Sequence, residues 1–117
     1  MSVADWRTEP YWQKRPGVHL KTITGAASQL CMIKLDPGMQ TDHRRPEEQM
    51  GFVLRGCVEL TIDGVRHVLE PGDAYLVPGN IRHGFKVVGA EPVEYLEVFT
   101  PPKAENAPAR APDAGLR

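Results

Sequence analysis

The sequence predicts an all-β protein made of two packed antiparallel sheets. Eleven glycines and eleven prolines divide its 117 residues into short apolar runs, a pattern typical of β-sandwiches and barrels. Asp63-Gly64 joins two of these runs, and this pair favours a hairpin turn because such a turn needs positive φ angles. No stretch shows helical periodicity beyond one turn. A chain of this length suggests one domain, so we expect eight to ten short strands around a single core.

Eight runs qualify as strands by their length and by their β-branched, aromatic or alternating residues. In chain order they are residues 19–24, 28–35, 50–55, 57–62, 65–69, 74–77, 84–88 and 93–99. Pro37-Gly38 and Pro71-Gly72 are turn pairs that separate neighbouring runs.

The two ends of the chain differ from this central region. Residues 1–17 carry Trp6, Tyr11 and Trp12, and we expect this aromatic arm to pack on its own barrel or on a second subunit. Residues 18–102 form the predicted barrel. Residues 103–117 contain few large apolar side chains and are predicted to be a flexible tail. The expected assembly is a homodimer with the arm at its interface.

Composition and charge exclude several kinds of partner. Fourteen basic and fifteen acidic residues leave a formal net charge of −1, so there is no basic excess to attract nucleic acid or an anionic membrane. No apolar run reaches the roughly 18 residues of a membrane span, and the N-terminus lacks the core of a signal peptide. Cys31 and Cys57 lie in strand-like runs and are expected to be buried free thiols, which fits the reducing cytoplasm.

Two short motifs carry the candidate site. The first is HRRPEEQ at residues 43–49, and the second is PGNIRH at residues 78–83. Residues two apart on a strand face the same side, so His43 and Arg45 should project together. Gln49 and His83 adjoin other runs and are expected to converge on the same point. Two imidazoles and an amide oxygen can bind a divalent metal such as zinc, nickel, iron or manganese.

The order of these residues resembles the two sequence motifs of the cupin superfamily. The matching positions are Gly38, His43, Arg45, Gln49, Gly56, Gly72, Pro78 and His83. The resemblance covers about residues 35–99 and implies a single cupin-type double-stranded β-helix, that is, a jelly-roll barrel. By position, His43, Gln49 and His83 take the metal-ligand places of the family. Arg45 stands where the family has a second histidine.

Two cupin subgroups are similar to this chain in more detail. One is the polyketide-cyclase cupins of aromatic antibiotic pathways, and the other is the small cupins that act on unsaturated uronates. Both resemble it in the glutamine form of the first motif and in the segment LEVFTPPK at residues 96–103. In the uronate enzymes the acidic, aromatic and basic positions of this segment are implicated in substrate handling, and these are Glu97, Phe99 and Lys103 here. The resemblance implies a cyclase, isomerase or lyase.

Glu97 and Arg45 are the candidate catalytic residues. A desolvated carboxyl group at Glu97 would have a raised pKa and could exchange protons near neutral pH. Arg45 has no lone pair to offer a metal. At about 4 Å and an effective dielectric near 20, its charge facing a dication costs about 8 kcal/mol before screening. Arg45 therefore either orients an anionic group beside a weakened metal site or replaces the metal in binding an oxyanion.

Three functions remain open from the sequence. The first is a metal-dependent enzyme acting on an oxygen-rich small molecule such as an aromatic polyketide intermediate. The second is conversion of a uronate, and the third is a metal-free binding or sensor protein in which Arg45 holds an anion. An iron dioxygenase is disfavoured because its carboxylate ligand would have to come from Glu47 or Glu48. Tyr75 and Phe85 join Phe99 and Lys103 as expected substrate-binding residues.

Overall fold

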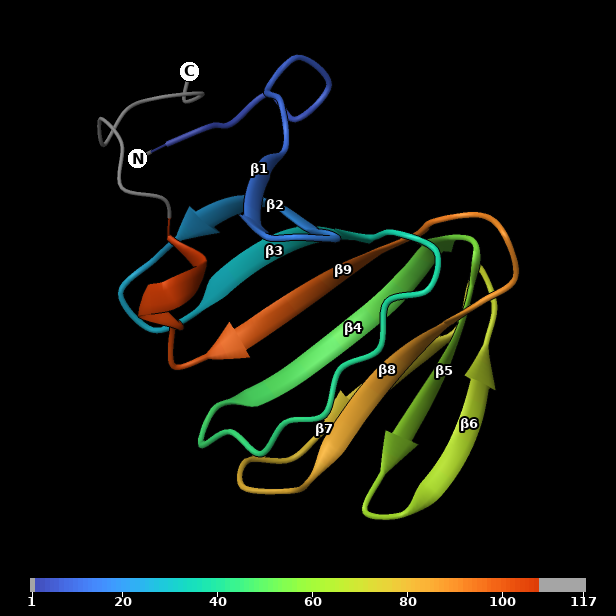
Figure 1. The fold of residues 1–117 in the computed structure, drawn as a ribbon. Coiled ribbons are helices and arrows are strands. Elements are labelled where there is room, and N and C mark those ends of the chain that lie inside the picture. The colour runs from blue at the N-terminus through green and yellow to red at the C-terminus, as the bar shows by residue number, and fades with distance from the viewer. Residues whose placement is uncertain (1, 108–117) are drawn as a thin grey trace.

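The computed structural model describes residues 2–107, which form nine strands in two antiparallel sheets (Figure 1). The large sheet has the strand order β1-β2-β3-β9-β4-β7, and the small sheet has the order β6-β5-β8. The strands are β1 (Trp12–Arg15), β2 (Val18–Thr24), β3 (Gln29–Leu35), β4 (Glu48–Arg55), β5 (Cys57–Ile62), β6 (Val65–Leu69), β7 (Ala74–Val77), β8 (His83–Val88) and β9 (Val93–Thr100). The predicted all-β class is confirmed, and each of the eight predicted strands is present within two residues at either end.

Strand β9 shows how the barrel interior is built. It lies between β3 and β4, and its residues alternate between buried and half-exposed positions, as a strand with one face on the core should. Val93, Tyr95 and Phe99 belong to the apolar core. Glu97 shares their inward face and is only 2% exposed. A carboxyl group is therefore placed inside the barrel by the same alternation that places the core.

The segment 36–47 links β3 to β4 and runs alongside β8 (Figure 1). Thr41 N donates to Phe85 O at 2.8 Å, and His43 and His83 exchange two backbone hydrogen bonds. We expected His43 and Arg45 to lie on a strand, but the segment makes only isolated bridges to β8. The alternation of a strand is kept, since His43 and Arg45 line the interior whereas Arg44 is exposed.

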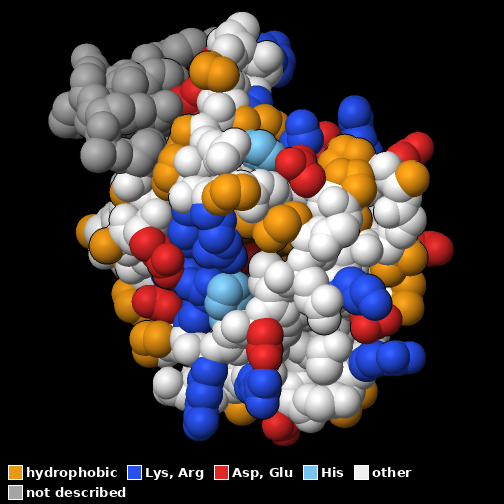
Figure 2. Space-filling view, in the orientation of Figure 1, with side chains coloured by type: hydrophobic (Ala, Val, Ile, Leu, Met, Phe, Trp, Pro, Cys, Tyr) orange, Lys and Arg blue, Asp and Glu red, His pale blue; other side chains and the backbone are white. Residues whose placement is uncertain are grey.

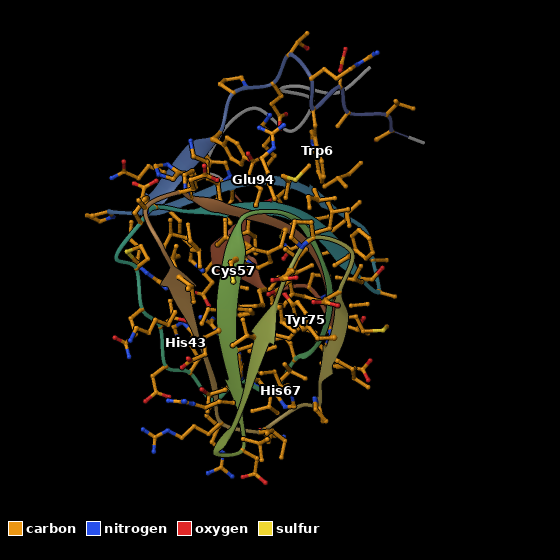
Figure 3. The ribbon with its side chains drawn as sticks, turned by 90° about the vertical axis from the view of Figure 1, so that its right-hand side faces the viewer. Trp6, His43, Cys57, His67, Tyr75 and Glu94 are labelled. Carbon is orange, nitrogen blue, oxygen red and sulfur yellow. The ribbon has the colours of Figure 1, made fainter. Side chains whose placement is uncertain are left out.

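The N-terminal arm packs on the barrel of its own chain. β1, which the sequence did not predict, pairs with β2 through Trp12 and Leu20, so the large sheet begins before residue 18. Lys21 Nζ donates to Trp6 O at 2.6 Å, and Tyr11 Oη donates to Glu94 Oε2 at 3.0 Å. Trp6 lies with the arm, outside the barrel interior (Figure 3). The role of this arm in a dimer stays a prediction.

The chain returns to the barrel after β9. A single turn of 3-10 helix, η1 (Ala104–Asn106), follows Lys103, and Lys103 and Asn106 are 4% and 2% exposed. Gln29 Nε2 donates to Lys103 O at 2.9 Å. The packed part of the chain therefore extends into the region predicted as a tail. The predicted flexibility of residues 108–117 lies outside the described residues.

Two smaller expectations can be compared with the structure. Cys31 and Cys57 are both free thiols, Cys31 fully buried and Cys57 half-buried. Within residues 2–107, no helix has the length and apolar character needed to cross a membrane.

Candidate active site

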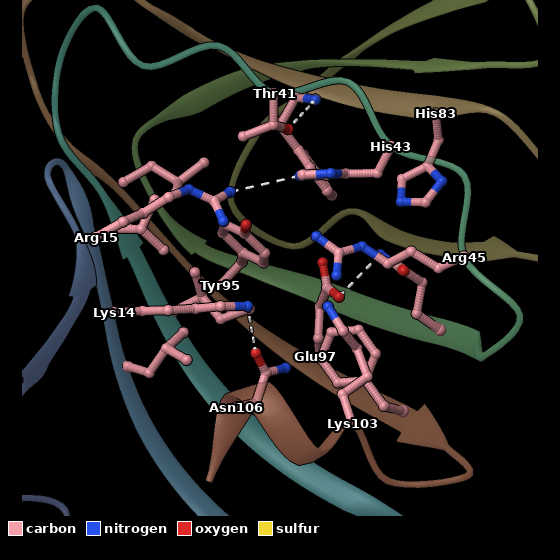
Figure 4. Close-up of a pocket in the computed structure, with 17 residues that line it drawn as sticks. Lys14, Arg15, Thr41, His43, Arg45, His83, Tyr95, Glu97, Lys103 and Asn106 are labelled. Atoms are coloured by element: carbon pink, nitrogen blue, oxygen red, sulfur yellow. Dashed lines mark hydrogen bonds between the residues drawn. The ribbon is translucent and has the colours of Figure 1, made fainter. Parts of the chain in front are cut away.

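A pocket lies between the inner face of the large sheet and the segment 36–47 (Figure 4). Its volume is about 50 Å³, which holds a few water molecules but is far below the roughly 300 Å³ at which small-molecule sites begin. Its polar lining consists of Lys14, Arg15, Thr41, His43, Arg45, Gln49, His83, Glu97, Lys103 and Asn106. Admission of a ligand therefore requires some of these side chains to move.

The pocket brings together most of the residues that the sequence singled out. The predicted ligands His43, Gln49 and His83 line it, and so do Arg45 and Glu97.

Of the expected substrate-binding residues, three lie in the pocket lining, namely Phe85, Phe99 and Lys103. Tyr75 differs from this expectation. It is absent from the described lining, and its hydroxyl instead donates to Glu97 Oε1 at 2.7 Å. Tyr75 thus supports a pocket residue rather than facing the cavity.

Glu97 forms the floor of the pocket. Gln49 Nε2 donates to Glu97 Oε2 at 3.0 Å, and Tyr75 Oη donates to the other carboxyl oxygen. Burial raises the pKa of Glu97 to about 7, and the hydrogen bond from Tyr75 and the charge of Lys103 oppose that rise without cancelling it. Both protonation states of Glu97 are therefore populated near neutral pH, which is the property that a general acid or base requires.

Gln49 can serve both protonation states of Glu97. Its Nε2 donates to the carboxylate, while its buried Oε1 has no hydrogen-bond partner among the described residues. An amide carries both donors and an acceptor. Rotation of the Gln49 amide by half a turn would present Oε1 to a protonated Glu97 as an acceptor.

Gly51 makes the contact between Tyr75 and Glu97 possible. In the register of the large sheet, Gly51 on β4 stands directly between Tyr75 on β7 and Glu97 on β9. A Cβ atom at position 51 would overlap the Tyr75 ring. The missing side chain lets Tyr75 reach across a whole strand, which sequence analysis did not anticipate. Figure 3 shows Tyr75 extending from the large sheet.

His43 and His83 face the pocket as neutral imidazoles. Their ring centroids are 6.1 Å apart. Burial, followed by the charges of Arg45 and Arg15, lowers the pKa of His43 to about 4, and burial also lowers the pKa of His83. His83 Nδ1 donates to Ile81 O at 3.0 Å, because a carbonyl can only accept. Its lone pair is therefore on Nε2. His43 Nε2 accepts from Arg15 Nη2 at 3.4 Å.

Basic side chains dominate the pocket rim. Lysine and arginine gather in a band beside a histidine on this face of the molecule (Figure 2). Lys14, Arg15, Arg45 and Lys103 all line the pocket. Burial, followed by the charge of Arg45, lowers the pKa of Lys103 to about 8. The rim is therefore suited to an anion.

These side chains do not fit a divalent metal ion. Arg45 extends between the two histidine rings and Glu97 (Figure 4), and a guanidinium there repels a cation. The lone pair of His43 Nε2 already accepts from Arg15. Within residues 2–107, there is no group of three or more His, Cys, Asp or Glu side chains arranged to hold a metal. The same arrangement suits the recognition of an oxyanion.

The chain belongs to the cupin family, because the model of the cupin domain matches residues 31–99. The pectin degradation protein KdgF of Dickeya dadantii (strain 3937) is 29% identical over 100 residues, which are 82% of this chain and 89% of KdgF. Protein SchB of Streptomyces halstedii is 32% identical over 71 residues, which are 58% of this chain and 51% of SchB. The solved structure of KdgF from Halomonas sp. matches with a TM-score of 0.80 at 24% identity and covers 87% of this chain and 94% of that one.

The comparisons confirm the predicted cupin jelly-roll barrel. The matched domain does not include every residue of the pocket. The cupin match ends at Phe99 and begins at Cys31, so Lys14, Arg15 and Lys103 lie outside it although they line the pocket. Sequence reasoning missed Lys14 and Arg15, because nothing in the motifs ties the N-terminal arm to the barrel interior.

Proposed function

We propose that this protein is an enzyme of the isomerase or lyase type that acts on a small anionic, oxygen-rich substrate, with a sugar acid as the favoured class. The observation that carries the proposal is the fully buried Glu97, whose pKa of about 7 places it at the midpoint of its titration near neutral pH. Burial of a carboxyl group costs free energy, and residues with strongly shifted pKa values cluster at functional sites. A fully buried carboxyl group with a raised pKa therefore suggests a functional role.

Proton transfer is the chemistry that Glu97 supports. In the isomerisation of an enol to a ketone, ionised Glu97 takes the hydroxyl proton and returns it to carbon, so that no proton is gained or lost overall. The negative charge that develops on the substrate oxygen is stabilised by Arg45 and Lys103, whose positive charges face the pocket before the reaction begins. Preorganised charge of this kind supplies much of the rate enhancement in many enzymes. A guanidinium would here take the electrostatic role that a metal has in other sites.

The choice of a sugar acid rests on charge and on similarity. Two or more rim cations can bind a substrate carboxylate. The curated relative with the longer match is KdgF, which is named for pectin degradation, and pectin consists largely of sugar acids. An unsaturated monouronate is therefore the first substrate to test.

A second candidate substrate is a flat aromatic polyketide intermediate. Phe85 and Tyr95 stack with ring centroids 5.1 Å apart in the pocket wall, and Phe99 adds a third aromatic side chain. The glutamine form of the first motif, which resembles that of the polyketide-cyclase cupins, also supports this alternative. The basic rim favours the sugar acid, because a carboxylate can pair with its positive charges whereas a neutral polyketide cannot.

The decisive experiment replaces Glu97 by glutamine. Glu97→Gln keeps the shape and can still accept from Tyr75 Oη, but it cannot carry a proton between substrate atoms. We expect turnover of an unsaturated monouronate, followed by proton NMR, to fall by about 10²- to 10⁴-fold. Glu94→Gln is the matched control, since Glu94 lies on the same strand and pairs with Tyr11 on the outer face.

Two results would reject the proposal. Turnover in Glu97→Gln equal to that in Glu94→Gln would remove Glu97 from the chemistry. Tight binding of uronate or polyketide without any turnover would identify a binding or sensor protein instead.

A further inference from the structure

One half-exposed carboxylate faces three nearly buried cations at the pocket rim. Glu105 Oε1 lies 2.6 Å from Arg45 Nη1 and 3.1 Å from Lys103 Nζ, and Glu105 Oε2 lies 3.1 Å from Lys14 Nζ. The side chains of Lys14, Arg45 and Lys103 are 12%, 15% and 4% exposed, whereas that of Glu105 is 51% exposed. The cations thus belong to the barrel, and the anion reaches them from outside.

The cluster carries more positive than negative charge. The ion pairs of these three cations within residues 2–107 all go to Glu105. The charges of the same cations also act on Glu97, so the surplus is two positive charges when Glu97 is protonated and one when it is ionised. Lys14 has a second contact, to Asn106 Oδ1 at 2.7 Å, but that acceptor is neutral. Buried charges are costly when they are incompletely paired, so additional negative charge would stabilise this cluster.

Glu105 is attached in a way that lets it leave. It lies on the single turn of η1, it is exposed, and its side chain makes the ion pair between this turn and Arg45. Rotation of that side chain into water breaks three ion pairs without moving a strand. The three cations come from β1, from the segment 36–47 and from the residues after β9, so the barrel would hold them in place after Glu105 has moved away.

We propose that Lys14, Arg45 and Lys103 form a subsite for a small oxyanion group that carries two negative charges, and that Glu105 is the internal carboxylate occupying this subsite when no ligand is bound. A dicarboxylate and a phosphate share this chemistry. Displacement of Glu105 also frees the three cations, which line the pocket, to bind a ligand.

This inference goes beyond the proposed function and shares only its pocket. A monouronate brings a single carboxylate to the subsite, whereas the surplus charge of the cluster favours a ligand with a second negative charge. Glu105 thereby becomes a residue that sets specificity. A ligand with one negative charge merely replaces Glu105, whereas a dianion also neutralises part of the surplus charge. The site should therefore discriminate between anions by charge.

The test measures anion binding without turnover. Wild-type protein and Glu105→Gln are titrated calorimetrically with malonate, inorganic phosphate and acetate at pH 7.5, where phosphate is mainly a dianion and Lys103 is still mostly protonated because its pKa is about 8. Ionic strength is low and constant, since salt screens such contacts. We expect a dianion to bind more tightly than acetate, and Glu105→Gln to bind it about tenfold more tightly than wild type, because removal of an internal competitor raises the fraction of binding-competent protein. The stronger of malonate and phosphate identifies the ligand chemistry.

Glu91→Gln is the control, because it removes the same charge from an exposed position in the turn between β8 and β9. It should leave each affinity within twofold of wild type. Lys14→Gln in the Glu105→Gln background should reverse the gain. Equal affinities in Glu105→Gln and Glu91→Gln, equal binding of acetate and the dianions, or no binding of any anion would each overturn the subsite. Loss of turnover in Glu97→Gln is measured separately, so either idea can fail while the other stands.

Discussion

The floor and the rim of the pocket come from different parts of the chain and do different work. The floor is built by β4, β8 and β9, inside the region matched by the cupin model, and it carries neutral or titrating groups such as Gln49, His83 and Glu97. The rim takes Lys14 from β1 and Lys103 from beyond β9, and it carries fixed positive charge. The difference teaches that the matched domain supplies the neutral and titrating groups of the pocket, whereas residues outside it supply most of the positive charge of the rim.

Arg45 contacts the rim through Glu105 and lies beside the histidines and Glu97 of the floor, so its replacement should have the largest effect on turnover. Arg45→Met keeps the length of the side chain but removes the charge that faces both histidines and pairs with Glu105. We expect turnover of a uronate to fall by about 10²- to 10³-fold, the range found when a preorganised stabilising group is lost. Arg44→Met is the control, because Arg44 is exposed and, among residues 2–107, its side chain donates to Asn80 O and not to a pocket residue. Similar kinetics in the two variants would show that the rim charge is not used in the reaction.

The same position also tests the metal prediction that the sequence raised. Arg45→His restores the family's second histidine between His43 and His83 and removes the repelling charge. We expect the variant to bind about one equivalent of zinc after dialysis against zinc and then buffer, as three imidazoles commonly do. Wild-type protein should retain less than about 0.1 equivalent. If elemental analysis finds a full equivalent of zinc in the wild type, the site binds metal in spite of Arg45, and the proposed exclusion of a metal is wrong.

The raised pKa of Glu97, in the floor of the pocket, should make the free energy of unfolding depend on pH. Glu97 has a pKa of about 7 when folded and an ordinary value of 4.5. Between these values the folded protein holds a proton that the unfolded chain has released, so a rise in pH favours unfolding. The free energy of unfolding is therefore lower by about 3 kcal/mol at pH 8 than at low pH.

Denaturant unfolding at pH 5 and pH 8 measures this effect. Glu97→Gln lacks the titration, so its free energy of unfolding should gain about 3 kcal/mol on that of the wild type between the two pH values. Glu91→Gln should gain nothing. A constant difference between wild type and Glu97→Gln would mean that the carboxyl group titrates normally.

Gly51 tests how the floor is supported. Gly51→Ala places a methyl group where the Tyr75 ring lies, and overpacking of this kind costs about 1–3 kcal/mol. It should also break the hydrogen bond from Tyr75 to Glu97 and lower turnover. The double variant Gly51→Ala, Tyr75→Leu should recover stability but not turnover, which separates the packing effect from the hydrogen bond. Recovery of both would show that Tyr75 only fills space.

Arg82 should show the smallest effect although it precedes His83. Its guanidinium pairs with Asp42 at 2.6 Å, but both side chains are exposed, at 75% and 59%. Exposed pairs contribute little to stability because water screens them. Arg82→Gln should therefore leave the thermal midpoint of unfolding nearly unchanged and alter turnover by less than twofold. A tenfold loss of turnover would extend the basic rim beyond the side chains that line the pocket.

Most strands could be predicted from the sequence because each is marked by a pattern in its own residues. The alternation in β9 and the Asp63-Gly64 turn need no knowledge of distant residues. β1 was not predicted, because its four residues include only one large apolar side chain, that of Trp12. Its extended conformation is stabilised by pairing with β2, which is a distant contact.

The same distinction between local and distant contacts applies to the pocket. His43, Gln49 and His83 were found through motif spacing. Lys14 was not, because the contact of Lys14 with Asn106 joins residues 92 positions apart. Tyr75 was expected to bind substrate, and its contact with Glu97 was not foreseen, since the gap left by Gly51 appears only when the register of three strands is known.

The burial of Lys103 and Asn106 has a practical consequence for how this protein is cut and joined to others. An expression fragment trimmed to the recognisable domain, residues 31–99, would omit β1, β2 and η1 and with them most of the rim. Even the wider fragment 18–102 would lose every charged side chain of the ion cluster except Arg45. The pocket therefore needs residues on both sides of the matched domain, and fusion tags belong after residue 107 rather than at the end of the last strand.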